Sequence, residues 1–137
     1  MSAPYTAIRA AFTTKLLTYP SVPSIAWENV PFTPVIGTAY IKPVLLPGEP
    51  LQAEIGTNGI NRHYGIFQIS IFAPAGKGIS TVSSLRDGLI DFFKRGTTLT
   101  HSGVTVRVRK AYPAPQMQET DWLHQPIMIQ FSADASN

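Results

Sequence analysis

The stretch that decides the fold is "RHYGIFQISIFA", Arg62 to Ala73, near the middle of the chain. Its β-branched and aromatic residues favour a strand, with Phe67, Ile69 and Ile71 alternating on one face. The other face is only partly polar, because it carries Ile66, Gln68, Ser70 and Phe72. We therefore expect a strand that is covered on both faces.

This strand leads into "FAPAGKGIS", Phe72 to Ser80, whose glycine-bracketed lysine suggests a phosphate-binding loop. Such a loop needs a glycine five positions before the second glycine, and a serine or threonine directly after the lysine. Ile71 and Gly78 stand at those two positions, so both requirements fail. Pro74 and the glycines instead predict a turn between a strand and a helix.

Two helices are predicted from apolar residues that recur at spacings of three and four. The first follows Pro4 and ends before Pro20, with an apolar stripe at Tyr5, Ile8, Phe12, Leu16 and Leu17. The second follows the glycine turn, with a stripe at Ile79, Val82, Leu85, Leu89 and Phe93. We expect Lys94 and Arg95 in its last turn and Gly96 as its C-terminal cap.

Four further segments are predicted to be extended. They are "SIAWENV" anchored by Trp27, Thr38–Leu46, the hairpin within "TTLTHSGVTVRVRKAY", and Trp122–Ser132. Pro43 restricts the second of these to a sheet edge or a bulge. The order of helix, strands, helix and strands predicts one α+β domain over 1–137, in which two helices pack on one face of a mostly antiparallel sheet.

The hairpin segment alternates cleanly, with Val104, Val106 and Val108 on one side. We expect these valines to point inward and Thr105, Arg107 and Arg109 to point outward. The outward arginines, together with Lys110, make "RVRK" the densest basic segment of the chain. They form either a solvated outer face or an electropositive strip that meets a partner's carboxylates or passing DNA phosphates.

A long connection, "PGEPLQAEIGTNGIN" from Pro47 to Asn61, contains two prolines, three glycines and an Asn-Gly turn signal. We predict a flexible hairpin or loop that projects from the domain. Loops of this length in compact domains are commonly functional.

Composition limits the classes of function. The chain of 137 residues has no cysteine and a net charge of +3. Hydrophobic residues make up 44% of it and charged residues 14%. These values exclude disulfides and cysteine-based sites, and they predict a surface poor in charge that contacts partners. We find no signal peptide or membrane span, and we expect a soluble chain of cytoplasmic origin.

No catalytic, cofactor or metal site is predicted. His63, His101 and His124 are far apart in the sequence, and none has a ligand-type companion. Asp87 and Asp91 fall on the polar side of the second helix, where acid–base catalysis is not expected. No serine lies in a nucleophile elbow.

Several segments, in this order, resemble phage tail terminator-like proteins. They are "IRAAF…LL…SIAWENVPFTP", "YGIFQISIFAPAGKG", "FFKRGTTLTHSGVTVRV" and "DWLHQPIMIQF", which together extend from about Ile8 to Phe131. No segment is a catalytic signature, and the specificity of the resemblance comes from order and spacing. The least generic segments are "AWENVPF" and the strand that ends in "PAGKG".

The resemblance implies a structural virion protein of a long-tailed phage. Relatives form a ring, typically of six subunits, that caps the head-proximal end of the tail tube, stops its polymerisation and offers a surface to the head connector. The implied partners are further copies of the chain, the major tail tube protein, the connector, and genomic DNA that passes without sequence-specific binding. For these contacts we predict Arg107, Arg109, Lys110, Glu49, Gln52, Glu54, Asn58 and Arg62.

Three alternatives stay open. A head–tail connector or head-completion protein would also assemble as a ring. A small nucleic-acid-binding module would use "RVRK", and would show salt-dependent DNA binding. A small enzyme is the least favoured alternative, because the motifs above fail.

Overall fold

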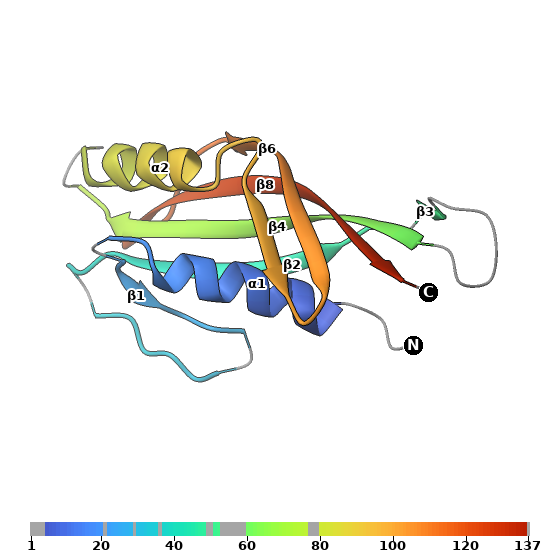
Figure 1. Cartoon of the computed structure of the whole chain (residues 1–137). Helices are drawn as coiled ribbons and strands as arrows, with labels where there is room; N and C mark the ends of the chain where they lie inside the picture. The colour runs from blue at the N-terminus through green and yellow to red at the C-terminus, as the bar shows by residue number, and fades with distance from the viewer. Residues whose placement is uncertain are drawn as a thin grey trace.

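The computed structural model in Figure 1 describes residues 5–20, 22–28, 30–35, 37–48, 51–52, 60–76 and 80–136. Its elements, in chain order, are α1 (Tyr5–Leu17), β1 (Ser24–Ile25), β2 (Tyr40–Pro47), β3 (Leu51–Gln52), β4 (Ile60–Pro74), α2 (Ser80–Phe92), β5 (Thr98–His101), β6 (Val104–Pro113), β7 (Met117–Gln118) and β8 (Trp122–Ser136).

One sheet joins all the strands, in the order β1-β2-β4-β8-β6-β5, with β3 added to β4 and β7 added to β8. Every pair is antiparallel except β1 and β2. β4 and β8 pair over 15 residues, from Ile60↔Ser136 to Pro74↔Trp122. The stretch singled out in the sequence is therefore the centre of the sheet, between β2 and β8.

Both helices cover the same face of this sheet, which we call the inner face (Figure 1). Phe12 of α1 is fully buried there and stacks on Phe67 at 4.5 Å between ring centroids, with Phe131 at 5.2 Å. Ile69, Ile127 and other alternating strand residues join the same core. The predicted α+β architecture, with two helices on one face of a mostly antiparallel sheet, is confirmed.

Pro43 lies where its missing N–H does no harm. The carbonyl of Ile41 accepts a bond from the Ala26 N–H, so the odd-numbered groups of β2 point away from β4. The nitrogen of Pro43, two residues after Ile41, also points away from β4. β1 pairs only with Tyr40 and Ile41, so no strand of the described segments faces Pro43 on that side. The prediction of an edge position is confirmed.

Three local predictions are wrong. Leu17 is 56% exposed, because it lies 100° around the helix from Leu16, and Ala11 is buried instead. α2 ends at Phe92, so Lys94 and Arg95 follow the helix rather than occupying its last turn. Gly96, at φ +92°, does not cap it: its N–H already bonds the carbonyl of Val108 in β6.

The turns follow their glycines. Ser102 and Gly103 both have positive φ, 50° and 80°, which is the conformation that tightens a two-residue hairpin between β5 and β6. Gly76, at φ +80°, turns the chain after β4 as predicted, while 77–79 lie outside the described residues. Neither helix in the described part of the chain is long and apolar enough to cross a membrane.

Candidate interaction surface

Four arginines gather on the face of the sheet away from the helices, which we call the outer face. Arg62 comes from β4, Arg107 and Arg109 come from β6, and Arg95 comes from the turn after α2. They line a hollow of about 600 Å³, the arginine cleft, whose other lining residues include Ser132 and Asp134 of β8. Strand alternation explains the gathering, since residues directly opposite on neighbouring strands point to the same face.

Arg62 and Asp134 form an ion pair within the cleft. The Arg62 Nε donates to one carboxylate oxygen of Asp134 at 2.8 Å and Nη2 donates to the other at 3.4 Å. These bonds lower the pKa of Asp134, although partial burial opposes the shift, and the charges of Arg107 and Arg109 add to the lowering. Because Asp134 is held by Arg62, the cleft keeps an excess of positive charge.

Arg109 takes its position from a β-bulge. The register of β6 against β8 shifts between Val108↔Phe131 and Lys110↔Gln130, which leaves Arg109 as the extra residue. Its Nε donates to the Ser132 hydroxyl at 3.2 Å, and its guanidinium lies 5.7 Å from the ring centroid of Tyr64. The bulge thus aims Arg109 across β8 toward β4.

The predicted contact residues have different outcomes. The structure brings Arg62, Arg107 and Arg109 together, and the inward valines and outward arginines of β6 are as predicted. Lys110 lies past the bulge, with its Nζ 4.9 Å over the ring of Tyr112. The backbone of Gln52, in β3, pairs with Asn61 of β4, whereas Glu49, Glu54 and Asn58 lie outside the described residues.

Sequence reasoning missed Arg95, Ser132 and Asp134. Arg95 was assigned to a helix that ends three residues earlier. Ser132 and Asp134 lie opposite Arg107 and Thr105 in the β6–β8 ladder, so the paired residues are 25 and 29 positions apart in the chain. The available signal was the alternation of polar Ser132 and Asp134 with buried Phe131 and Ala133 at the end of the chain.

A second hollow adjoins the arginine cleft. We call it the apolar hollow; it has a volume of about 550 Å³ and its lining includes Leu46, Gly48, Tyr64, Ile66 and Gln130. Arg109 lines both hollows. Leu46 is 42% exposed, so this part of the outer face offers an apolar contact directly beside the guanidinium groups.

The opposite end of the outer face carries a row of aromatic rings. Tyr40, Phe72 and His124 face one another across β2, β4 and β8, with ring centroids 4.8 Å and 4.4 Å apart. Phe32 lies 5.0 Å from Tyr40, and Trp122 packs edge-on at 5.1 Å. The sequence predicts that β4 is covered on both faces. On the outer face this cover is a layer of aromatic rings, and it lies at one end of the strand only.

His63 is buried, and His124 is half-buried. His63 packs edge-on against Tyr5 at 5.5 Å, and His124 stacks on Phe72. Burial lowers the pKa of both, although Asp134 opposes the shift at His63 and Glu119 opposes it at His124. A buried nitrogen of each, Nδ1 of His63 and Nε2 of His124, lacks a hydrogen-bond partner among the described residues.

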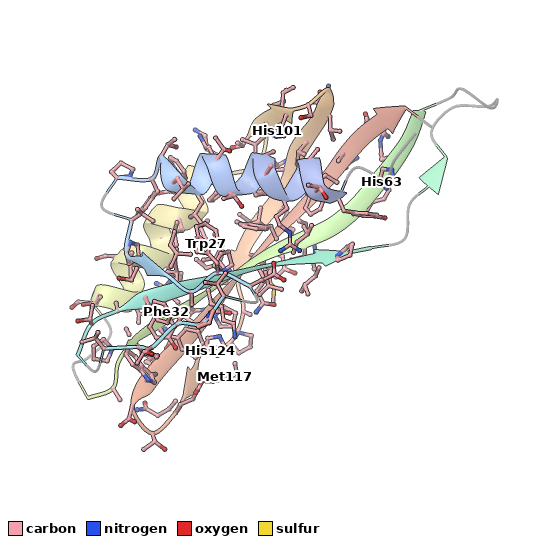
Figure 2. All side chains as sticks on the ribbon, turned by 90° about the horizontal axis from the view of Figure 1, so that it is seen from below. Trp27, Phe32, His63, His101, Met117 and His124 are labelled. Carbon is pink, nitrogen blue, oxygen red and sulfur yellow. The ribbon has the colours of Figure 1, made fainter. Side chains whose placement is uncertain are left out.

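An acidic turn closes the aromatic end, between β7 and β8. We call residues 117–121 the acidic tip: Met117 is 48% exposed, and Glu119 and Asp121 are exposed. Its backbone is well held, since the Glu119 N–H bonds the Trp122 carbonyl at 2.8 Å and the Ala75 N–H bonds the Asp121 carbonyl at 3.1 Å. Figure 2 shows Met117 near one end of the long strands and His63 near the other.

Comparison with known proteins identifies the family and the fold of the chain. The sequence model of a family described as "Phage tail terminator protein" matches residues 7–131. One solved structure superposes with a TM-score of 0.75 at 24% identity, covering 97% of this chain and 96% of its own, which establishes a shared fold. No curated protein matches the chain.

Proposed function

The chain belongs to the phage tail terminator family, and we propose that it forms the ring that closes the head-proximal end of the tail tube. It is a structural protein of the phage tail. In the proposed role the ring, of six subunits by the resemblance stated above, stops addition of tube subunits and offers its other side to the head connector.

The observation that carries the proposal is the family match over most of the chain. The fold supports it, because a closed ring needs two different patches on each subunit that fit one another head to tail. The sheet has two different edges, β2 with the short β1 on one side and β5 on the other. The two ends of its outer face also differ, one lined by arginines and the other by aromatic rings and an acidic tip.

We further propose that the segment 47–61, which runs from the last residue of β2 to the first residues of β4, contacts the tube. The paired arms of β2 and β4 hold its two ends, from Pro47↔Gly65 back to Tyr40↔Phe72. Hydrogen exchange within 47–61 should slow when tail tube protein is added. Equal exchange in the free and tube-bound states would overturn this assignment.

Electron microscopy of phage that lack the protein tests the proposed role. A missing terminator leaves tails that grow past their normal length. A missing connector, the nearest alternative, leaves tails of normal length that are detached from heads. Regular tails joined to capsids in the absence of the protein would overturn the proposal.

A nucleic-acid-binding module is less well supported by the site. The arginine cleft adjoins a hollow whose lining includes Leu46 and Ile66, and such a hollow suits an apolar side chain of a protein partner better than a phosphate. We therefore assign the cleft to a protein contact, as argued next.

A further inference from the structure

We propose that the acidic tip of one copy docks into the arginine cleft and apolar hollow of the next copy. The inference rests on the proposed ring function, because it names the two subunit surfaces that close the ring. Two features of the outer face carry it: the position of the surfaces at opposite ends, and the match of their chemistry.

The two surfaces cannot meet within one copy. β8 begins at Trp122, directly after the tip, and reaches the cleft through Ser132 and Asp134. Asp134 lies thirteen positions after Asp121, along β8, and at about 3.3 Å per residue the two are roughly 40 Å apart. A contact between tip and cleft is therefore a contact between copies, and in the proposed ring it joins each copy head to tail with the next.

The charges of the two surfaces are complementary. The described residues that line the cleft include four arginines and one acid, Asp134, which Arg62 already holds. Arg95, Arg107 and Arg109 are left to receive carboxylates. The tip supplies two, Glu119 and Asp121, both exposed. Guanidinium groups bind carboxylates through paired, charge-assisted hydrogen bonds, which fix orientation as well as adding affinity.

The apolar parts of the two surfaces also match in their positions relative to the charges. Met117 is exposed within two residues of Glu119, and the apolar hollow joins the cleft at Arg109. A flexible thioether side chain adapts well to a shallow hollow. One short turn thus carries an apolar group beside two carboxylates, and the receiving surface carries an apolar hollow beside three guanidinium groups.

A rigid tip also favours binding. The two backbone bonds that hold Glu119 and Asp121 limit the conformational entropy that docking would remove. The Glu119 carboxylate lies 3.5 Å from Nδ1 of His124.

Charge exchange between the two surfaces tests the inference. We expect Arg107→Glu with Arg109→Glu, and separately Glu119→Arg with Asp121→Arg, to reduce ring assembly by about tenfold or more. Native mass spectrometry with and without tail tube protein measures the change. The two pairs combined should restore assembly. The control Asp87→Arg with Asp91→Arg makes the same charge change as Glu119→Arg with Asp121→Arg, but on the exposed side of α2. This control should leave assembly unchanged.

A milder exchange keeps the test valid should the double variants misfold. Arg95 and Asp121 are both exposed, so Arg95→Glu and Asp121→Arg should each weaken assembly and together restore it. Thermal unfolding of every variant shows whether the fold is intact.

The outcomes separate this inference from the proposed function. Rings that form normally in all folded variants overturn the inference and leave the proposed function standing. Loss of assembly without rescue in the combined variants also overturns it, and loss of DNA binding by Arg107→Glu with Arg109→Glu, with rings intact, would assign the cleft to DNA. A wild-type protein that forms no ring, alone or with tube protein, overturns both.

Discussion

The two faces of the sheet carry different side chains, apolar on the inner face and partly charged on the outer face. On the inner face, Ile69, Ile127 and Val106 are fully buried under the helices and join one apolar core. On the outer face of the same strands, Arg62, Arg107 and Arg109 surround an open cleft. Alternate residues of a single strand therefore serve folding and recognition separately.

This separation has a practical consequence. A substitution on the inner face removes packing from a core that cannot easily relax, whereas a substitution on the outer face changes what the surface binds. Substitutions at Gly65 or in the Arg62–Asp134 pair should affect stability less than a substitution in the core and more than one at an exposed arginine. The four predictions below test the contrast, beginning with the largest expected effect on stability.

Phe12→Ala should cause the largest loss of stability. The ring is fully buried between Phe67 and Phe131, so its removal leaves a cavity and should cost about 3–5 kcal/mol of unfolding free energy. Urea unfolding measures the loss. Leu17→Ala, on the exposed side of the same helix, should change stability by less than about 0.5 kcal/mol. Similar effects of the two substitutions would contradict the placement of the core.

Gly65→Ala should have an intermediate effect. A Cβ at this position would lie 2.8 Å from the carbonyl oxygen of Leu46 and 2.9 Å from Cζ of Phe131. Backbone of β2 must then shift, at a cost of roughly 1–3 kcal/mol. Thermal unfolding checks this value, and an unchanged midpoint would show that β2 and β4 are less closely packed than described.

Asp134→Asn should have a small, pH-dependent effect. The folded-state pKa of Asp134 is lowered, so its pairing with Arg62 stabilises the fold above the unfolded pKa of about 3.9 and is lost as pH falls through the lower folded value. For a partly exposed pair we expect about 0.2–1 kcal/mol at neutral pH. Urea unfolding from pH 7 to pH 2 should show the wild type and the variant converging in acid.

Two results would contradict this account of Asp134. One is a stability difference that stays constant over the whole pH range. The other is an equal effect of Asp91→Asn, a matched amide substitution at an exposed residue of α2.

Arg107→Glu should leave stability nearly unchanged, within about 0.5 kcal/mol, because the side chain is exposed on the outer face. Assembly should nevertheless weaken. Lys94→Glu, an equal charge change at an exposed residue after α2, is the control for assembly. Loss of stability with assembly intact would reverse the roles that we assign to the two faces.

Local patterns were enough to predict the larger elements. The apolar alternation of Arg62–Ala73 identified the central strand, and the valines of 104–108 identified the inner face of β6. The Ser102–Gly103 turn and the edge position of Pro43 followed from the conformational limits of glycine and proline. Each of these signals lies within a few neighbouring residues.

The remaining features depend on distant residues. β1, β3 and β7 are two residues long, too short to show a period of two. Asp134 reaches Arg62 across 72 residues of sequence, through a register that the whole β4–β8 ladder sets. Arg95 enters the cleft only because Gly96 bonds Val108 and brings the chain to β6. No local pattern encodes such contacts.

The most direct test of the central claim is growth of tail tubes from purified tube protein, followed by light scattering and electron microscopy. We predict that this protein, added at far less than one copy per tube subunit, binds one end of each tube and halts elongation there. Tubes that continue to grow at the original rate, with the protein absent from their ends, would contradict the account.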